Sequence, residues 1–101
     1  MRIVWTFDAR EDLTAIREHI SRNSPYYAAL QIRRLIESVR QLKRFPLSGR
    51  VVPEVRSSEY RELIRSRYRI VYRIRNETIE VLMVFHTSRD PDELAEHFKD
   101  L

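Results

Sequence analysis

The pattern of hydrophobic and polar positions is clearest between residues 60 and 89. From Tyr68 to Ile74, apolar or aromatic side chains occupy every even position, and two of the three odd positions are arginines. In the segment from Ile79 to His86, the odd positions are all apolar. Because successive side chains of a strand point to opposite faces of a sheet, each segment is predicted to be a strand with one buried face. The short Asn76-Glu77 loop predicts that the two strands form a hairpin.

The same alternation predicts the register of this hairpin. Pairing Ile74 with Ile79 makes one face wholly apolar, with the pairs Tyr72–Val81, Ile70–Met83 and Tyr68–Phe85. The opposite face then carries the pairs Arg73–Glu80, Val71–Leu82, Arg69–Val84 and Arg67–His86. A slip of one residue would turn the arginines into the core, so this register is predicted to be strongly specified.

Two further strands are predicted upstream of the hairpin. Tyr60–Arg65 is predicted to pair with the first hairpin strand and to set Leu63 beside Ile70 on the apolar face. The segment Val51–Val55 contains Pro53, which lacks the backbone N–H that a central strand needs. We therefore expect an edge strand or an irregular segment there.

The N-terminal part begins with an alternating segment, Arg2 to Phe7, which predicts a strand. Asp8 is predicted to cap a following helix, because Glu11 stands three residues later as in a capping box. The apolar stripe of this helix recurs at spacings of three and four residues, at Leu13, Ile16 and Ile20, and the pattern fades at Asn23.

A second helix is predicted to open at Ser24-Pro25, a cap followed by a proline in the first turn. Its apolar positions are Ala28, Ile32, Leu35, Val39 and Leu42. The helix is predicted to run to about Arg44, because Phe45-Pro46 disfavours helical geometry before the proline. The two helices form an antiparallel hairpin whose combined apolar stripe packs on the apolar face of the sheet.

The C-terminal part is predicted to turn at Thr87–Pro91 and then to form a short helix. This helix starts at Asp90 or Asp92 and runs through Phe98, with Leu94 and Phe98 four residues apart. The predicted fold class is therefore α+β within a single domain of residues 1–101. The predicted domain consists of an N-terminal strand, a helical hairpin, a mostly antiparallel sheet of three to four strands and a short C-terminal helix.

Composition adds a preference for anionic partners. Two of the 19 basic residues are lysines, so 17 are arginines, and the formal net charge is +4. The rigid guanidinium fork suits carboxylates and phosphates, which points to an acidic protein or a nucleic acid. The alternative is an ordinary solvated surface with Arg–Glu pairs, since 15 acidic residues are spread among the bases.

The polar face of the predicted sheet holds the candidate chemistry. Its binding candidates are Arg67, Arg69, Arg73 and His86, with Arg89 just beyond. Cleavage of RNA through its 2′-hydroxyl needs proton transfer and cations that stabilise the phosphate, so Arg69, His86 and Arg89 are the catalytic candidates for a nuclease. The alternative is structural: Arg73 pairs with Glu80, Arg69 with Glu62, and Arg89 with Asp90 or Asp92.

Other classes of site are disfavoured. The absence of cysteine excludes disulfides and thiolate metal sites, and the three histidines do not share a ligand spacing, so neither a metal nor a cofactor is predicted. A single glycine excludes a glycine-rich phosphate loop. Charges interrupt the first twelve residues, and no segment has the apolar length of a membrane span, so we expect a cytoplasmic protein.

Several short motifs, in their order along the chain, resemble the RelE/ParE superfamily of bacterial toxins. They are Ala9 with Asp12-Leu13, Phe45-Pro46, Ser48-Gly49-Arg50, Arg61-Glu62-Leu63, Tyr68-Arg69-Ile70-Val71-Tyr72, and a strand ending in His86 followed by Arg89. The resemblance implies the toxin of a type II toxin–antitoxin (plasmid stabilisation) system, bound in a hetero-oligomer by a cognate antitoxin.

The resemblance leaves two targets open. RelE-like toxins cleave mRNA on the ribosome with basic residues of the sheet, commonly helped by a tyrosine or histidine near the C-terminus. ParE-like toxins bind DNA gyrase and poison it. No tyrosine follows Tyr72 here, and Leu94 stands where a RelE-like tyrosine is expected. The chain therefore resembles the ParE branch more closely, which favours gyrase; a basic binding module without toxicity is a third reading.

Overall fold

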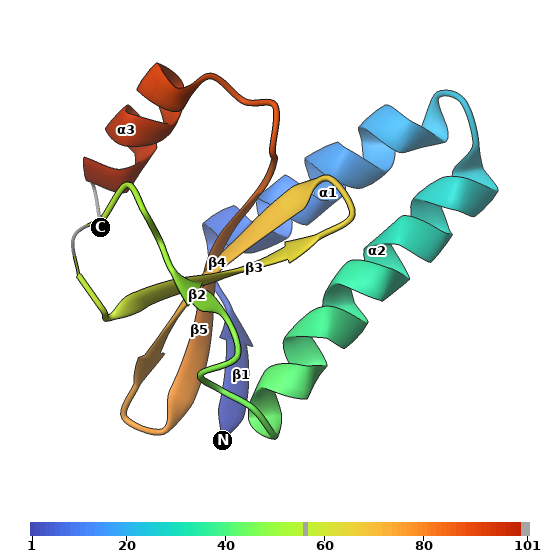
Figure 1. Cartoon of the computed structure of the whole chain (residues 1–101). Helices are drawn as coiled ribbons and strands as arrows, with labels where there is room; N and C mark the ends of the chain where they lie inside the picture. Colours follow the sequence, from blue (N-terminus) through green and yellow to red (C-terminus); the bar gives the residue numbers. More distant parts are fainter. Residues whose placement is uncertain (56, 100–101) are drawn as a thin grey trace.

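A central sheet separates two long helices from a short C-terminal helix in the computed structural model, which describes residues 1–55 and 57–99 (Figure 1). The elements in chain order are β1 (Arg2–Trp5), α1 (Phe7–Ser21), α2 (Pro25–Arg40), the 3₁₀ turn η1 (Gln41–Lys43), β2 (Arg50–Val51), β3 (Tyr60–Arg65), β4 (Tyr68–Arg75), β5 (Thr78–His86) and α3 (Pro91–Lys99). The strand order is β1-β5-β4-β3-β2, with β1 parallel to β5 and the other pairs antiparallel. The α+β prediction is confirmed, although the sheet has five strands because both β1 and the short β2 join it.

The first helix begins earlier than predicted. Thr6, not Asp8, is its N-cap, and the Thr6 hydroxyl accepts a hydrogen bond from the Ala9 N–H at 3.1 Å. The same hydroxyl donates to the Leu82 carbonyl at 3.3 Å, which ties the helix start to β5. As a result the strand stops at Trp5, and Phe7 is 65% exposed in the first helical turn rather than buried in a strand.

The helical hairpin forms as predicted. Ser24 caps α2 by accepting from the Tyr27 N–H at 3.1 Å, and Pro25 stands in the first turn. Helix α2 ends at Arg40, and η1 continues the path to Lys43, just before Phe45-Pro46. The hairpin side of the sheet is a buried core to which both layers contribute: Ala9, Leu35, Val39, Leu42, Leu63, Ile70, Tyr72, Ile79, Val81 and Val84.

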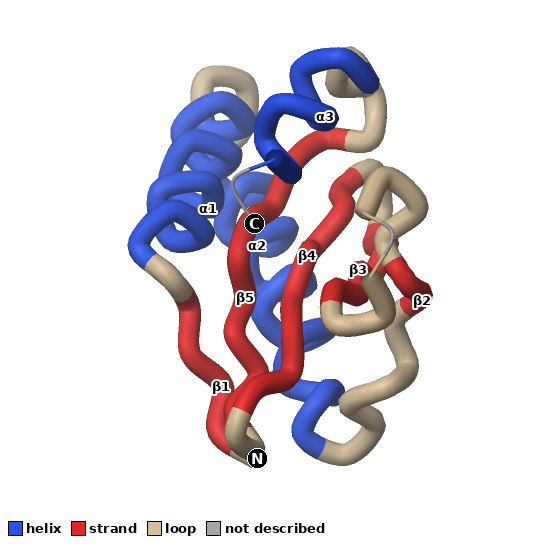
Figure 2. The backbone as a smooth tube through the Cα atoms, turned by 90° about the vertical axis from the view of Figure 1, so that its left-hand side faces the viewer, coloured by secondary structure: helices blue, strands red, loops and turns tan. Residues whose placement is uncertain are grey.

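A second buried cluster covers the other face of the sheet, where α3 lies across from α1 and α2 (Figure 2). Its members are Val52, Tyr60, Val71, Met83, Phe85 and Phe98. The Phe98 ring of α3 meets the Phe85 ring edge to face, with centroids 6.1 Å apart. Asp90 precedes α3 and its carboxylate accepts from the Asp92 N–H at 2.8 Å, which confirms the predicted start of the helix. The side chain of Leu94 and residues 100–101 lie outside the described part.

The predicted register of the hairpin is correct near the loop and wrong beyond a β-bulge. Ile74–Ile79, Arg73–Glu80 and Tyr72–Val81 pair as predicted, and then Leu82 has no partner. The remaining pairs are each shifted by one residue: Val71–Met83, Ile70–Val84, Arg69–Phe85 and Tyr68–His86. A bulge puts one extra residue in one strand, so every later side chain of β5 changes face. Met83 and Phe85 therefore lie in the α3-side cluster, and the predicted pairs Ile70–Met83, Tyr68–Phe85, Val71–Leu82, Arg69–Val84 and Arg67–His86 are wrong.

The pairing of β3 with β4 and the edge position of β2 agree with the predictions from the sequence. Leu63 lies opposite Ile70 across β3 and β4, as predicted. Strand β2 is a short edge strand that pairs Arg50 with Glu62, and the chain leaves the sheet before Pro53. In the described part of the chain, no helix combines the length and apolar character needed to cross a membrane.

Gly49 allows the segment before β2 to approach the sheet closely. The Gly49 N–H donates to the Tyr72 hydroxyl at 3.0 Å, and that hydroxyl donates to the Pro46 carbonyl at 2.8 Å. A Cβ at position 49 would lie 2.7 Å from the Tyr72 ring and 2.7 Å from the Glu62 carbonyl oxygen. The Phe45-Pro46 and Ser48-Gly49-Arg50 motifs thus hold the end of the helical hairpin against the sheet.

Candidate functional site

The bulge divides the predicted site residues between the two faces of the sheet. His86 lies directly opposite Tyr68, and their rings meet edge to face with centroids 5.4 Å apart. Tyr68 packs against the core on the helical-hairpin side, so His86 lies on that side. Arg69 and Arg73 lie on the opposite, α3 side, where Arg69 pairs with Phe85 and Arg73 with Tyr60. Arg69 and His86, predicted to share one face, are therefore separated by the sheet.

Arg69 is buried in a cage of carboxylates and aromatic rings. It is 8% exposed, and each of its three side-chain nitrogens donates to a carboxylate. Nη1 and Nη2 donate to the two oxygens of Glu54 at 2.7 Å, while Nε and Nη2 donate to Glu62, the former at 2.8 Å. The guanidinium carbon lies 5.0 Å from the Phe85 ring centroid and 5.9 Å from that of Phe98, within reach of cation–π attraction.

Glu62 extends this arrangement to the edge of the sheet. Its side chain is fully buried, and its second oxygen accepts from Arg50 Nε at 2.8 Å and lies 2.7 Å from Arg50 Nη2. We call the chain of contacts Glu54–Arg69–Glu62–Arg50 the ionic network. The predicted Arg69–Glu62 pair is confirmed. Glu54 and Arg50 were missed, because neither lies in a segment whose periodicity assigns it a face.

The ionic network is held in its charged form. Hydrogen bonds from Arg69 lower the pKa of Glu54 below its ordinary value, against the opposing effect of burial. The hydrogen bonds that Arg69 donates to Glu54 are the largest influence that raises the pKa of Arg69. Four of the five N–H groups of Arg69 already donate to Glu54 and Glu62, so its charge is largely neutralised within the fold.

Arg73 and Arg89 are also paired. Arg73 lies 3.3 Å from Glu80, as predicted, and 3.9 Å from Glu59. The hydrogen bond that Arg73 donates to Glu80 is the main cause of the raised pKa of Arg73. Arg89 follows β5 and lies 3.5 Å from Glu93, one turn into α3, rather than pairing with Asp90 or Asp92. Its side chain is 38% exposed, so this pair contributes little to stability.

Arg67 and His86 line a cavity at the end of the helical hairpin where a short loop joins α1 to α2. The cavity has a volume of about 300 Å³ and is lined by Ile20, Tyr27, Gln31, Ser66, Arg67, Tyr68 and His86. We call it the His86 cavity. His86 Nδ1 accepts from the Ser88 N–H at 3.0 Å and lies 2.6 Å from the Ser88 hydroxyl, which fixes the ring. Gln31 was missed by the sequence reasoning, although a polar residue three positions after Ala28 in an apolar stripe is a detectable signal.

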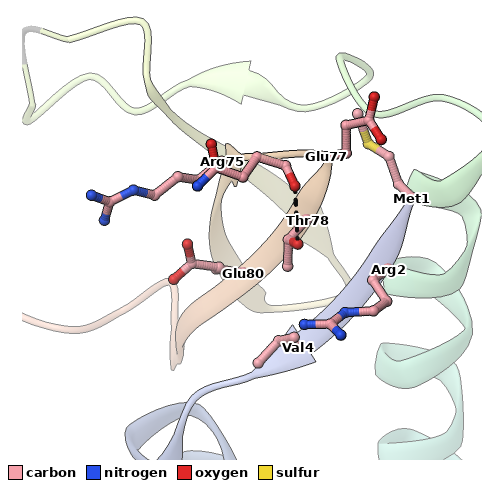
Figure 3. Close-up of a pocket in the computed structure, with 8 residues that line it drawn as sticks. Met1, Arg2, Val4, Arg75, Glu77, Thr78 and Glu80 are labelled. Carbon is pink, nitrogen blue, oxygen red and sulfur yellow. Dashed lines mark hydrogen bonds between the residues drawn. The ribbon is translucent and has the colours of Figure 1, made fainter.

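A larger hollow at the outer edge of β1 brings no reactive groups together. It has a volume of about 800 Å³ and lies beside the hairpin loop of β4 and β5. Figure 3 shows the guanidinium groups of Arg2 and Arg75 far apart. Within residues 1–55 and 57–99, no group of three or more histidine, aspartate or glutamate side chains is placed to hold a metal ion.

Comparison with known proteins connects these features to one family. Residues 3–91 match the family model described as the ParE toxin of the type II toxin–antitoxin system parDE. The chain is 32% identical over 89 residues to Toxin RelE2 of Caulobacter vibrioides, which covers 87% of this chain and 97% of the relative.

Solved structures agree on the fold. A chain of the chromosomal ParDE system from P. aeruginosa has a TM-score of 0.72 at 24% identity, covering 87% of this chain and 97% of that one. A chain of the RelBE2 toxin–antitoxin complex from Mycobacterium tuberculosis has a TM-score of 0.57 at 27% identity, covering 84% and 95%. The YoeB/ParE toxin from Agrobacterium tumefaciens has a TM-score of 0.60 at 22% identity, covering 85% and 98%. Because the family model spans most of the chain, this protein belongs to the ParE toxin family of type II toxin–antitoxin systems.

Proposed function

We propose that the protein, as one toxin domain of residues 1–101, acts in the cytoplasm by inhibiting DNA gyrase and is held inactive in a hetero-oligomer by a cognate antitoxin. The antitoxin partner is supported by the solved relatives, which come from a ParDE system and from a RelBE2 toxin–antitoxin complex. Gyrase as the target is supported by the ParE family match and by the arrangement of the candidate catalytic residues.

The observation that carries the choice of gyrase is the separation of Arg69 from His86. A nuclease needs a proton-transfer group and a phosphate-stabilising cation within hydrogen-bond reach of the same phosphodiester. Here Arg69 lies on the α3 side with all three nitrogens donating to carboxylates, and His86 lies on the other side of the sheet. This arrangement favours a toxin that acts by binding its target over a toxin that cleaves RNA.

The alternative is a RelE-like mRNA endonuclease. It is favoured by the similarity to Toxin RelE2 and to the RelBE2 complex. Its chemistry would have to use Arg67 with His86, since these two line the same cavity, while Arg69 stays in the ionic network.

The two functions are separated with purified protein. We expect it to inhibit supercoiling of relaxed plasmid by gyrase and to accumulate cleaved plasmid, while mRNA in a translating extract stays intact. His86→Ala should leave supercoiling inhibition unchanged, as should His19→Ala, a matched removal of an exposed histidine on α1. Cleavage of mRNA that His86→Ala abolishes and His19→Ala preserves would overturn the proposal.

A further inference from the structure

The His86 cavity is lined by hydrogen-bond donors and by a single formal cation. Tyr27, Tyr68, Ser66 and Arg67 line the same cavity of about 300 Å³, and among the described residues no aspartate or glutamate lines it. Arg67 is exposed and forms no ion pair with a carboxylate of residues 1–55 or 57–99. The arginines of the sheet face differ, because Arg69 and Arg73 are already neutralised by their own carboxylates.

His86 adds a further donor. Its Nδ1 accepts the Ser88 N–H at 3.0 Å, so the neutral ring carries its proton on Nε2. The edge-to-face contact with Tyr68 fixes the plane of the ring. Both imidazole nitrogens therefore have defined roles, and Nε2 is the one left to bind a group entering the cavity.

Gln31 is a second polar group of this cavity that has unused hydrogen-bonding capacity. Gln31 is 2% exposed, and its Oε1 is buried without a hydrogen-bond partner among the described residues. Buried side-chain amides are normally satisfied, and an unsatisfied one is destabilising. The unsatisfied atom is an acceptor, so a bound carboxylate requires the amide to rotate until its NH2 group, which donates, faces the ligand.

We propose that the His86 cavity binds the carboxylate of an aspartate or glutamate side chain supplied by the antitoxin, with Arg67 as the counter-ion. This proposal rests on the proposed toxin function for the source of the carboxylate. The single negative charge of a carboxylate matches the single arginine of the lining. Ile20 and the rings of Tyr27 and Tyr68 form an apolar wall that suits the methylene groups of an acidic side chain. A nucleic acid is a poorer match, because its affinity accumulates over several phosphate contacts and this cavity offers one cation.

The cavity is tested without the antitoxin by following NMR signals of the isolated protein during titration. The probes are the blocked peptide acetyl-Leu-Glu-Leu-amide, its glutamine counterpart and inorganic phosphate at constant ionic strength. We expect saturable shifts of the His86 ring and of the Gln31 side-chain amide with the glutamate peptide only. Arg67→Ala should weaken that binding about tenfold or more, the loss expected for one charge-assisted contact. Arg65→Ala, which removes an exposed arginine next to the same turn, is the matched control and should bind as the unchanged protein does.

Three results would overturn the cavity assignment. They are equal shifts with the glutamine peptide, tighter binding of phosphate than of the glutamate peptide, and insensitivity to Arg67→Ala. The source of the carboxylate is tested separately with the product of the reading frame beside the gene. Arg67→Ala, but not Arg65→Ala, should raise the dissociation constant of that complex about tenfold or more. If the Arg67→Ala substitution does not change the affinity for this product, the antitoxin is not the source of the carboxylate. If the product does not bind at all, the proposed function fails, whereas the result of the peptide titration is unaffected.

Discussion

Arg69 shows how a residue with the chemistry of a catalyst can serve the fold. Its guanidinium joins the segment after β2, through Glu54, to the sheet, through Glu62, and stacks against two phenylalanines. The Glu62 side chain is fully buried, so its charge depends on Arg69 and on the half-exposed Arg50. Removing one partner of a buried ion pair is destabilising because the other charge stays desolvated.

We therefore expect Arg69→Ala to lower the free energy of unfolding by about 3 kcal/mol or more. Arg67→Ala removes an exposed arginine two residues away that forms no ion pair with the described residues, and it should change this free energy by less than about 0.5 kcal/mol. Urea denaturation of the two variants measures both values. Equal, small losses would contradict the structural role of Arg69. A large loss would also mean that an inactive Arg69→Ala toxin says nothing about catalysis.

The ionic network also predicts a pH dependence. The folded-state pKa of Glu54 lies below its unfolded value because Arg69 donates to its carboxylate. Its contribution to stability is therefore complete above the unfolded pKa of about 4.3 and is lost as the pH falls through the folded pKa. Glu54→Gln should be less stable than the unchanged protein at neutral pH, and the difference should shrink below about pH 4. Denaturation midpoints measured from pH 7 to pH 3 test this, and a constant difference would count against it.

Among the elements, β5 decides where the functional side chains lie. The residues from Val81 to Phe85 are all apolar, so no alternation of apolar and polar residues indicates which face of the sheet each side chain occupies. The uninterrupted register predicted from the arginines of β4 therefore held only as far as Val81. The bulge at Leu82 determines which later residues of β5 face each core: Val84 faces the helical hairpin and Phe85 faces α3.

Deleting Leu82 should remove this bulge without changing the faces of the later residues. Without the extra residue, a continuous ladder keeps the pairs Val71–Met83 and Arg69–Phe85, so Phe85 still faces Phe98. We therefore expect the deletion variant to fold and to keep the contact between the two rings. Its loss of stability should be at least that of Leu82→Ala, because both variants remove a leucine side chain that packs against the α3-side cluster. Chemical denaturation and ring-to-ring nuclear Overhauser effects measure the two outcomes. A deletion variant that folds but loses the Phe85–Phe98 contact would contradict the assignment of Leu82 as the extra residue.

For the whole molecule, the sequence was sufficient for the layers and insufficient for the site. Helical spacing, caps and the Asn76-Glu77 loop predict the hairpin of helices and the antiparallel strands because these signals are local. The site depends on which face each polar side chain occupies, and one bulged residue reverses that assignment for His86. Arg73–Glu80 and Arg69–Glu62 were predictable across adjacent strands, whereas Glu54 reaches Arg69 from an irregular segment.

The proposed action of this ParE-family toxin on gyrase, and not on mRNA, is tested most directly in growing cells. The protein is induced, and DNA breaks and mRNA integrity are followed in the same culture over the first minutes. The separation of Arg69 from His86 predicts that DNA breaks accumulate while mRNA stays full length. Rapid cuts at defined codon positions in mRNA, with intact DNA, would contradict it.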